Sequence, residues 1–460
     1  MATECIQKDF GFHPLKHREI RAQFDGGAIT TEGGGLLLRE VEKRIGIVRQ
    51  FAACFRDYRN ADLIEHTVEE LVAQRVYGLA LGYEDLNDHE ELRKDALLAV
   101  LVEKSDPVGE VLAGKSTLNR LELTPSTASA KARYKKIVAD HAAVDRLFVE
   151  VFLAAHPQAP PQIILDLDAT DDPLHGNQEG RFFHGYYGHY CYLPLYIFCG
   201  EFLLGARLRP SNIDASAGSM EELQRIVKQI RAVWPEVRMV VRGDSGFCRE
   251  ELMAWCEAES VDYVLGLAKN ERLKAEIKKA LRKAKRQYHE TGRAARFFRE
   301  FYYQTRKSWS RRRRVVAKAE HLEKGENPRF VVTSLTAEEW PAPALYETLY
   351  CARGEMENRI KEQLMLFADR TSTAYLRSNQ LRLYFSSVAY VLLQMLRRLG
   401  LAGTELAKAQ CATIQLKLLK IGALIRISVR KVWVSLAGGY PYVALFRQIH
   451  ENLRAVPLKC

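Results

Sequence analysis

The spacing of apolar and polar residues divides the chain into helical ends and a centre that contains strands. From Leu36 to about Gly82 the apolar side chains recur every three or four residues, and the same spacing returns over Asp88–Val102 and Ser129–Ala154. This spacing places apolar side chains on one face of a helix. The proline-rich stretch Ala155–Gln162 then ends the helical pattern. We therefore predict a helical N-terminal domain over residues 1–155.

The pattern changes at Ile163–Asp172, where alternate side chains share a face as they do in a β-strand. Asp166 and Asp168 lie on the same predicted face as Ile164, and leucines occupy the other face. Carboxylates at the end of a buried strand are costly unless they are paired, hydrogen-bonded or bound to a metal. Two hypotheses follow: a strand that runs into an acidic turn, or the first carboxylate of a metal-dependent nuclease site.

Further strands and helices follow the first predicted strand. Phe182–Phe198 is dense in aromatic residues, and its second half forms a predicted hairpin with Glu201–Leu208. His184 and His189 lack matched metal-ligand partners, which favours an aromatic, polar surface over a metal site. The strand Val237–Val241 ends in Arg-Gly-Asp-Ser-Gly, which places a second carboxylate, Asp244, at a strand end. The alternation of elements predicts a mixed α/β sheet.

A basic and aromatic segment begins near Asn270. Lys274–Lys285 predicts a strongly basic helix, and strand-prone sequence continues from it to Phe330–Leu335. Interleaved basic and aromatic residues favour contact with phosphates and stacking on bases, although a charged run can also be a solvated surface. The candidate nucleic-acid contacts in this segment are Trp309, Arg311, Arg312, Arg313 and Arg314.

Ala344–Phe367 predicts one helix that carries a polar stripe. Tyr350, Arg353, Glu357 and Lys361 fall within about 80° of arc when each residue turns the helix by about 100°. By itself the stripe could be a row of surface ion pairs between successive turns. The two strand-end aspartates favour a second hypothesis, in which Glu357 is the third carboxylate of a metal site.

Composition indicates a folded, basic protein of several domains. The chain has 460 residues, of which 47% are hydrophobic, and 68 Lys and Arg against 57 Asp and Glu give a formal net charge of +11. This excess favours a polyanionic partner. The nine cysteines form no C-x-x-C pair, the N-terminus lacks the apolar core of a signal peptide, and Phe385–Met395 is too short to cross a membrane. We expect a soluble, cytoplasmic protein with reduced thiols and no membrane partner.

One motif suggests a different function. Gly109–Ser116 matches the P-loop pattern of nucleotide-binding proteins and would predict an NTPase. The residues between the glycines are bulky where a phosphate cradle prefers small ones. Asp106 and Pro107 also break the chain where a buried strand should lead into the loop. A P-loop NTPase is therefore kept only as an alternative.

Three motifs together resemble the DDE transposases of bacterial insertion sequences. They are Asp168-Ala-Thr170 on the first strand, Arg242-Gly-Asp244-Ser-Gly after a later strand, and Tyr350-x2-Arg353-x3-Glu357 on the predicted helix. The third resembles the branch that has a Tyr-Arg-Glu-Lys helix signature and a β-rich insertion. The resemblance covers about Ile163 to Phe367.

One position departs from the signature of that branch. The branch usually has a lysine seven residues after the glutamate, where this chain has Leu364. Lys361, one helical turn after Glu357, is the candidate replacement, which leaves its role open.

The resemblance implies an RNase H-like α/β fold, with a mixed-sheet catalytic core interrupted by a β-rich insertion and flanked by helical regions. The expected domains are a helical DNA-binding domain (1–155), the first part of the core (156–272), the basic β-rich insertion (273–336), the second part of the core (337–371) and a mostly helical C-terminal region (372–460).

The resemblance also implies a catalytic and metal-binding site made of Asp168, Asp244 and Glu357. Two Mg²⁺ ions, with Mn²⁺ as a substitute, would activate the nucleophile and stabilise the leaving oxygen of a phosphodiester. Asp168 is expected to bridge both ions, and Asp244 and Glu357 to bind one each. Asp166 is the alternative for the first position. Asp171 and Asp172, which follow the strand end, are expected in a solvent-facing turn.

The remaining polar residues of the site are expected to hold DNA. Arg353 and Lys361 would contact phosphates beside the scissile bond, Arg353 through its two-pronged guanidinium. Tyr350 would position the end nucleotide, and Trp309 would stack on a displaced base.

The implied enzyme cuts double-stranded DNA at the terminal inverted repeats of an insertion sequence and transfers the 3′ ends to target DNA. Because two ends must be cut together, we expect a homodimer in a paired-end complex. A nucleoid-associated location in the cytoplasm follows from the DNA partner. A catalytically inactive, DNA-binding derivative of such an enzyme is the alternative from another functional class.

Overall fold

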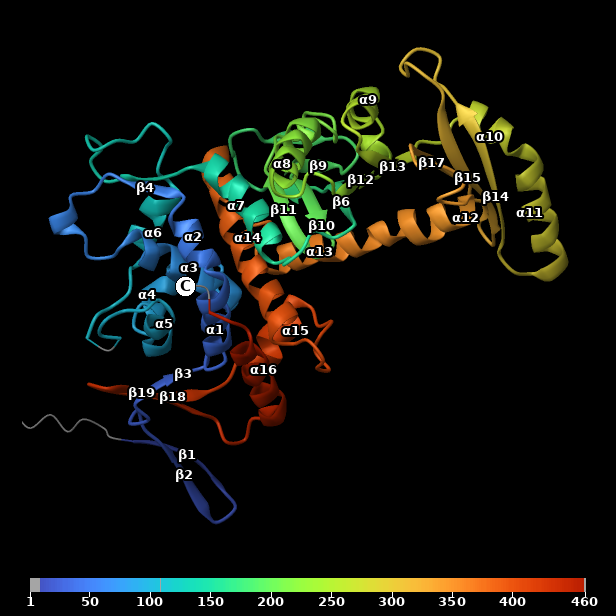
Figure 1. Cartoon of the computed structure of the whole chain (residues 1–460). Helices are drawn as coiled ribbons and strands as arrows, with labels where there is room; N and C mark the ends of the chain where they lie inside the picture. Colours follow the sequence, from blue (N-terminus) through green and yellow to red (C-terminus); the bar gives the residue numbers. More distant parts are fainter. Residues whose placement is uncertain (1–8, 108, 459–460) are drawn as a thin grey trace, which may run out of the picture. The chain divides into compact units, whose positions relative to one another are not determined.

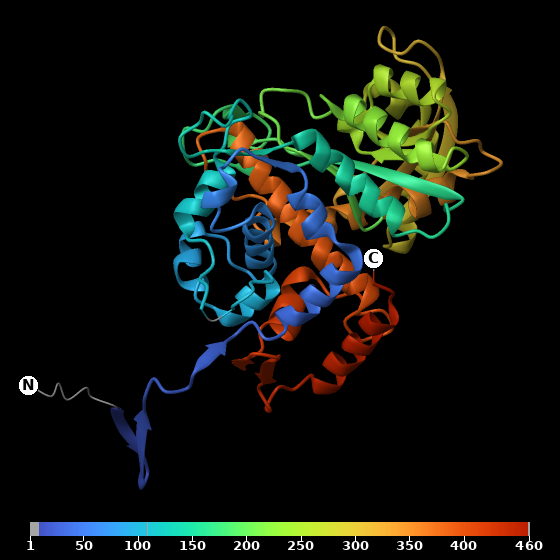
Figure 2. The same ribbon diagram turned by 60° about the vertical axis from the view of Figure 1, so that its left-hand side comes forward.

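The computed structural model describes residues 9–107 and 109–458 (Figures 1 and 2). Contacts within the chain define two units, one made of Met1–Val138 with Val388–Cys460 and one made of Ala139–Ser387. The longest helix of the central unit, α14 (Leu376–Leu399), continues past the boundary at Ser387. Among the described residues, no helix combines the length and apolar character that a membrane span requires.

The central unit is built on a mixed sheet of nine described strands, in the order β11-β10-β6-β12-β13-β17-β15-β14, with β16 paired to β15. This architecture confirms the predicted mixed α/β core. The strands of the unit are β6 (Gln162–Ala169), β7 (Asp172–Pro173), β8 (Phe182–His184), β9 (His189–Tyr192), β10 (Leu195–Cys199), β11 (Phe202–Arg207), β12 (Arg238–Gly243), β13 (Asp262–Leu267), β14 (Ala295–Tyr303), β15 (Arg313–Leu322), β16 (Gly325–Glu326) and β17 (Arg329–Thr333). Its other helical segments are α7 (His141–Ala154), α8 (Ser219–Val233), η3 (Ser245–Phe247), α9 (Glu250–Ala258), α10 (Glu271–Glu276), α11 (Lys278–Thr291), α12 (Ala342–Ala344), η4 (Leu345–Tyr350), η5 (Cys351–Arg353) and α13 (Gly354–Met365).

Strand β6 lies near the centre of the sheet, antiparallel to β10 and parallel to β12. Ile163, Leu165 and Leu167 are buried on one face, as the alternation predicted. On the other face, Ile164 packs against an apolar cluster that includes Leu349 of the π-helical turn η4. The helical segment that carries the polar stripe therefore covers the same face of the sheet as the strand-end acids.

The basic segment extends this sheet instead of forming a separate one. Strand β17 pairs with β13 of the core, β15 pairs with β17, and β14 pairs with β15 at the edge. Helix α11 packs on β14 and β15 (Figure 1). The segment is rich in β-structure, as predicted, and it covers an edge of β13 that would otherwise be open.

By contacts within the chain, helix α7, which precedes the proline-rich stretch, belongs to the unit that begins at Ala139. The domain boundary near residue 156 stays a prediction. Helix α7 packs on β11 and α8, because it buries apolar side chains such as Phe148 and Phe152. The Phe152 ring lies 5.4 Å from the ring of Phe202 and 5.5 Å from that of Trp234. The apolar face of α7 therefore packs against the sheet.

The helix predicted over 344–367 is present but irregular. The π-helical turn η4 and the 3₁₀ turn η5 precede the regular helix α13, so Tyr350 and Arg353 lie outside it. The Arg242 guanidinium donates to the Leu349 carbonyl at 2.5 Å, within the π-helical turn. A side chain that enters the backbone hydrogen-bond ladder is one recognised cause of such irregularity.

Arg242 also forms a buried ion pair with Asp166 on the neighbouring strand. The two side chains are among the least exposed charged groups of the unit, at 5% and 3%. Arg242 Nη2 lies 2.7 Å from Asp166 Oδ2, and Nε contacts the other carboxylate oxygen. A two-pronged contact of this kind fixes the orientation of both side chains. It connects β6, β12 and the π-helical turn.

We expect Asp166→Leu to lower the free energy of unfolding by about 3–5 kcal/mol, because it leaves the Arg242 charge buried without a partner. Urea denaturation followed by circular dichroism measures this change. The double variant Asp166→Leu/Arg242→Met should recover much of the stability, since it removes both charges. Equal stability of the wild type and the single variant would contradict this role.

The second unit is mainly helical and also contains small sheets. Strand β18 (Ala423–Ser428) pairs with β19 (Lys431–Leu436) and with β3 (Ala28–Thr30), which joins segments from both ends of the chain. The other elements are β1 (Phe10–Leu15), β2 (Arg18–Ala22), α1 (Gly35–Ile45), α2 (Ile47–Ala52), β4 (Phe55–Asp57), η1 (Ala61–Leu63), α3 (Val68–Ala80), η2 (Leu86–Asp88), α4 (His89–Leu92), α5 (Ala96–Leu101), α6 (Lys115–Glu122), β5 (Ile137–Ala139), α15 (Cys411–Ile414), η6 (Gln415–Leu419) and α16 (Val443–Ala455).

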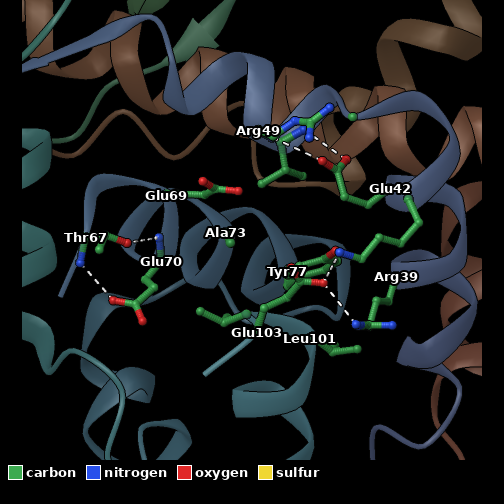
Figure 3. Close-up of a pocket in the computed structure, with 14 residues that line it drawn as sticks. Arg39, Glu42, Arg49, Thr67, Glu69, Glu70, Ala73, Tyr77, Leu101 and Glu103 are labelled. Atoms are coloured by element: carbon green, nitrogen blue, oxygen red, sulfur yellow. Dashed lines mark hydrogen bonds and ion pairs between the residues drawn. The ribbon is translucent and has the colours of Figure 1, made fainter. Parts of the chain in front are cut away.

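A cavity of about 360 Å³ lies between helices of this unit (Figure 3). Its charged lining residues largely satisfy one another: Arg39 donates to Glu103 at 2.9 Å, and Glu42 accepts backbone N–H groups of Val48 and Arg49 at 3.0 and 3.1 Å. Burial raises the pKa of Glu42 to about 7, although these backbone hydrogen bonds lower it. The lining is therefore a structural network that holds the start of α2.

We expect Glu42→Gln to remove a pH dependence of stability. The wild-type carboxyl binds a proton more tightly when folded, so the free energy of unfolding should fall between about pH 4.5 and 7 as the unfolded chain loses that proton first. The difference in melting temperature, variant minus wild type, should therefore rise from about pH 5 to about pH 8. Thermal melts at several pH values measure it.

Glu69→Gln is the matched control, because Glu69 lines the same cavity but is exposed, and its charge has only a small effect on the pKa of Glu42. It should leave the pH dependence of the melting temperature close to that of the wild type. A constant difference between Glu42→Gln and the wild type across this range would show that Glu42 does not carry the effect.

Candidate active site

Two adjacent parallel strands, β6 and β12, bring Asp168 and Asp244 to the same end of the sheet, where both strands finish. Gly243 of β12 pairs with Leu167 of β6, so the residues that follow them, Asp244 and Asp168, are level with each other. Both lie two residues after the Arg242–Asp166 pair, and side chains at that spacing share a face. The sheet register therefore accounts for the proximity of these two carboxylates.

Asp244 is held at the start of the short turn η3. Its Oδ1 accepts the backbone N–H of Gly246 at 2.8 Å, which fixes the side chain by a local cap. On the next strand, a Cβ added to Gly266 would lie 2.8 Å from the backbone nitrogen of Ser245 and 2.6 Å from the hydroxyl of Tyr350. Only glycine permits this approach, so Gly266 lets the Tyr350 hydroxyl lie against the turn that carries Asp244.

Arg353 connects the strand-end carboxylate to the helix carboxylate. Its Nη1 lies 3.1 Å from Asp168 Oδ2, and its Nη2 lies 2.9 Å from Glu357 Oε1. Asp168 and Arg353 are largely buried, whereas about half of the Glu357 side chain, 48%, is exposed. The structure therefore brings Asp168 and Glu357, from distant parts of the sequence, to one shared cationic partner.

The three carboxylates interact electrostatically. Burial raises the pKa of Asp168 to about 6, the Arg353 charge opposes this shift, and the Asp244 and Glu357 carboxylates add to it. Burial also raises the pKa of Tyr350, and Asp244 contributes to that shift. Mutual repulsion of this kind is expected where several carboxylates share a site without a sufficient positive charge.

The donor set fits a divalent ion of the Mg²⁺ type, because such ions prefer carboxylate oxygens. Within residues 9–107 and 109–458, however, no three His, Cys, Asp or Glu side chains already stand close enough together to form a metal site. The Arg353 guanidinium occupies the position between Asp168 and Glu357. It supplies one positive charge against these two carboxylates.

The other acids near this strand have structural roles. Asp166, the alternative for the first carboxylate, uses both of its carboxylate oxygens in the ion pair with Arg242. The prediction that Asp172 faces solvent is wrong: it is 2% exposed, accepts from Thr371 Oγ1 at 2.8 Å, and has a pKa raised by burial to about 8. Asp171 pairs with His189, with Oδ2 and Nε2 2.8 Å apart.

The predicted DNA contacts differ in their accessibility. Lys361 is exposed on α13, one turn beyond Glu357, and Tyr350 is partly buried. Trp309 is only 6% exposed, and its ring packs edge-on against Tyr303 with centroids 5.8 Å apart. A buried ring has no free face for a base, so the structure gives Trp309 a packing role instead.

The four arginines after Trp309 also divide into two kinds. Arg313 and Arg314 are 3% and 7% exposed. Arg313 pairs with Glu250 at 2.6 Å and with Glu257 at 2.7 Å, and Arg314 pairs with Glu300 at 2.6 Å. Arg311 and Arg312 are exposed, and Arg311 also contacts Glu257. Most of this positive charge is therefore neutralised within the protein.

Sequence reasoning missed the structural functions of Arg242 and Gly266. Arg242 shares a strand face with Asp244, and that spacing could have indicated a partner for Asp166 on the adjacent strand. The contact between Gly266 and Tyr350 joins segments far apart in the chain, and no local pattern signals it.

The P-loop match does not form a phosphate-binding loop in the described structure. Residues 109–114 follow helix α5 and a turn region, with no described strand leading into them. The backbone N–H of Lys115, at the start of α6, donates to Glu90 at 2.9 Å, and its Nζ donates to Asn87 at 3.1 Å. A carboxylate therefore lies where the motif would require a phosphate.

The match to a known protein family supports the resemblance. No curated protein sequence matches the chain significantly. A solved structure, the piggyBac transposase synaptic complex with hairpin DNA, aligns with 93% of this chain and 86% of that chain, at 10% sequence identity and a TM-score of 0.40. Residues 12–458 match the family described as "Transposase DDE domain group 1". Because this match covers nearly the whole sequence, the chain belongs to the group 1 DDE transposase family and is a DNA transposase.

Proposed function

We propose that Asp168, Asp244 and Glu357 are the catalytic carboxylates of this transposase. The observation that carries the proposal is the bridge from Asp168 through Arg353 to Glu357, which joins the end of strand β6 to the helix α13. A site that attracts one cation between two carboxylates suits a divalent cation as well. The reaction that follows is cleavage of phosphodiester bonds at insertion-sequence ends and transfer of the 3′ ends to target DNA.

The three carboxylates would hold two Mg²⁺ ions, or Mn²⁺ in their place. When bound, such ions activate the attacking oxygen and stabilise the leaving oxygen. Two observations support this proposal: Asp168 lies at the end of a central strand of the sheet, and Asp244 is held by its cap on η3. Glu357 is the most exposed of the three, so it is the most free to reorient as the site closes on DNA.

Arg353 and its neighbours on the helix would bind the DNA strand being cut. A guanidinium released from Asp168 and Glu357 can present two N–H groups to a phosphate. The exposed Lys361 would contact a second phosphate as a point charge. The Tyr350 hydroxyl, which lies against the turn after Asp244, would position the terminal nucleotide.

We expect Asp168→Ala, Asp244→Ala and Glu357→Ala each to reduce the cleavage rate by more than roughly 100-fold. A loss of up to roughly 100-fold is typical when the residue removed only hydrogen-bonds to a metal ligand, and these residues would be ligands themselves. The measurement is Mg²⁺- or Mn²⁺-dependent cleavage of DNA that carries the terminal repeats, resolved on denaturing gels. Each variant removes a ligand that the others cannot replace, so the losses should not add in combination.

Glu355→Ala is the matched control, because Glu355 is an exposed carboxylate on the same helix, two residues from Glu357. It should cleave as the wild type does. If any one of the three alanine variants cleaves as fast as the wild type, the residue that it replaces is not catalytic.

We also propose that α11 binds the DNA backbone. Its buried face, with Ala280, Leu281 and Ala284, packs on the sheet. Its outer face carries exposed cations, namely Lys278, Lys279, Arg282, Lys283, Lys285 and Arg286. The described structure shows no ion pair for these six, unlike Arg313 and Arg314. This face is better placed for phosphates than the predicted arginine run.

The triple variant Lys278→Ala/Arg282→Ala/Lys285→Ala should bind DNA more weakly than the wild type. Its DNA affinity should also depend less steeply on salt concentration. Each phosphate that the variant no longer neutralises should reduce the slope of log K against log salt by about 0.9. Fluorescence anisotropy on a duplex between about 50 and 200 mM salt measures the slope. Lys274→Ala is the control, since Lys274 already pairs with Glu271 at 2.7 Å. An unchanged slope in the triple variant would remove α11 from the interface.

Both ends of an element must be cut together, so the active form would be a homodimer that holds two terminal repeats in a paired-end complex. We infer this assembly from the need to cut two DNA ends in one reaction.

A further inference from the structure

The hairpin formed by β8 and β9 presents aromatic rings to solvent. Phe182 is 41% exposed, Phe183 57%, Tyr186 87% and Tyr190 44%. Large side chains that gather on one exposed element usually mark a surface for a partner. Aromatic rings also lose little conformational freedom on binding, which makes them effective contacts.

These rings are held in place by one another and by a cation. The Phe183 and Tyr190 rings pack edge to face with centroids 5.6 Å apart, and the Tyr186 and Tyr187 rings do so at 5.0 Å. The Arg181 guanidinium lies over the Tyr190 ring, 4.1 Å from its centroid. The hairpin therefore offers a prearranged surface.

The hairpin is anchored to the segment that directly follows Asp168. His189 pairs with Asp171 at 2.8 Å, and the Tyr190 carbonyl accepts the backbone N–H of Leu174 at 2.9 Å. The short strand β7 also pairs with β9. Burial raises the pKa of Tyr187 to about 12, and the carboxylates of Asp171 and Asp168 contribute to this shift. The hairpin thus adjoins the segment that follows Asp168, one of the three proposed catalytic carboxylates.

We propose that the β8–β9 hairpin binds an unpaired base of the DNA next to the scissile phosphate, by stacking on Phe183 and Tyr186. The proposal rests on the proposed catalytic site, because it gives the substrate of that site a second point of contact. A base has two apolar faces that match exposed aromatic rings, and stacking tolerates any base.

Charge favours DNA over another occupant of this surface. Residues 181–192 contain one arginine, two histidines and no acidic residue. His189 is paired with Asp171, so Arg181, whose guanidinium lies over the Tyr190 ring, is the charge of this segment that can face a phosphate. The buried Trp309 cannot supply the same contact, since its ring is packed against Tyr303.

A forked DNA duplex with 2-aminopurine in its unpaired arm tests the proposal, since stacking quenches this base. The wild type should prefer the forked duplex to a fully paired one of the same sequence and should quench the probe. In the double variant Phe183→Ala/Tyr186→Ala, the ratio of the affinity for the forked duplex to that for the paired duplex should fall by at least about fivefold. Tyr186→Phe keeps the ring and should bind as the wild type does.

Trp433→Ala removes another aromatic ring, which is 57% exposed and lies in the other unit, and should have no effect. Thermal melts confirm that the variants are folded. The proposal is overturned if the wild type shows no preference for the forked duplex, or if the double variant binds and quenches as the wild type does. It is also overturned if the double variant alters only the oligomeric state, because the surface would then be a protein interface.

The two proposals can fail separately. Ring-dependent binding of the forked duplex without metal-dependent cleavage would reject the catalytic assignment and leave the hairpin contact intact. Metal-dependent cleavage with ring-independent binding would reject the hairpin contact alone.

Discussion

The buried ion pair between Asp166 and Arg242 is the interaction on which the arrangement of the site depends. It joins two neighbouring strands and, through the Leu349 carbonyl, the irregular helix that crosses their ends. Because Asp168 and Asp244 follow on the same strand faces, the pair also fixes the direction in which both carboxylates leave the sheet. A charge pair at the surface would constrain these elements less, since solvent and salt weaken it.

Next to this neutral pair lies a group of charges that is not balanced. Asp244 and Glu357 each interact electrostatically with Asp168, and the Arg353 cation contacts Asp168 and Glu357. The guanidinium and a metal ion cannot occupy the same space between Asp168 and Glu357. If a divalent ion binds between these carboxylates, as proposed, Arg353 would have to leave that position.

Local sequence patterns predicted the strand with Asp168, the strand end at Asp244 and the helix with Glu357, because alternation and helical spacing depend on near neighbours. The resemblance supplied their combination into one site. Burial of Arg313 could not be predicted, since its partners Glu250 and Glu257 lie far away in the sequence. Asp172, which local polarity had placed in solvent, is likewise buried by a distant segment, through its hydrogen bond with Thr371.

The pairing of β17 with β13 has a consequence for how the chain can be divided. The segment 273–336 interrupts the core in sequence, yet it completes the same sheet through backbone hydrogen bonds to the core. Its removal would expose the edge of β13 and uncover apolar residues such as Val264 and Leu345 of the shared cluster. The insertion is thus no detachable module, and a shortened chain that lacks it would lose part of the support beneath the helical segment that carries Arg353 and Glu357.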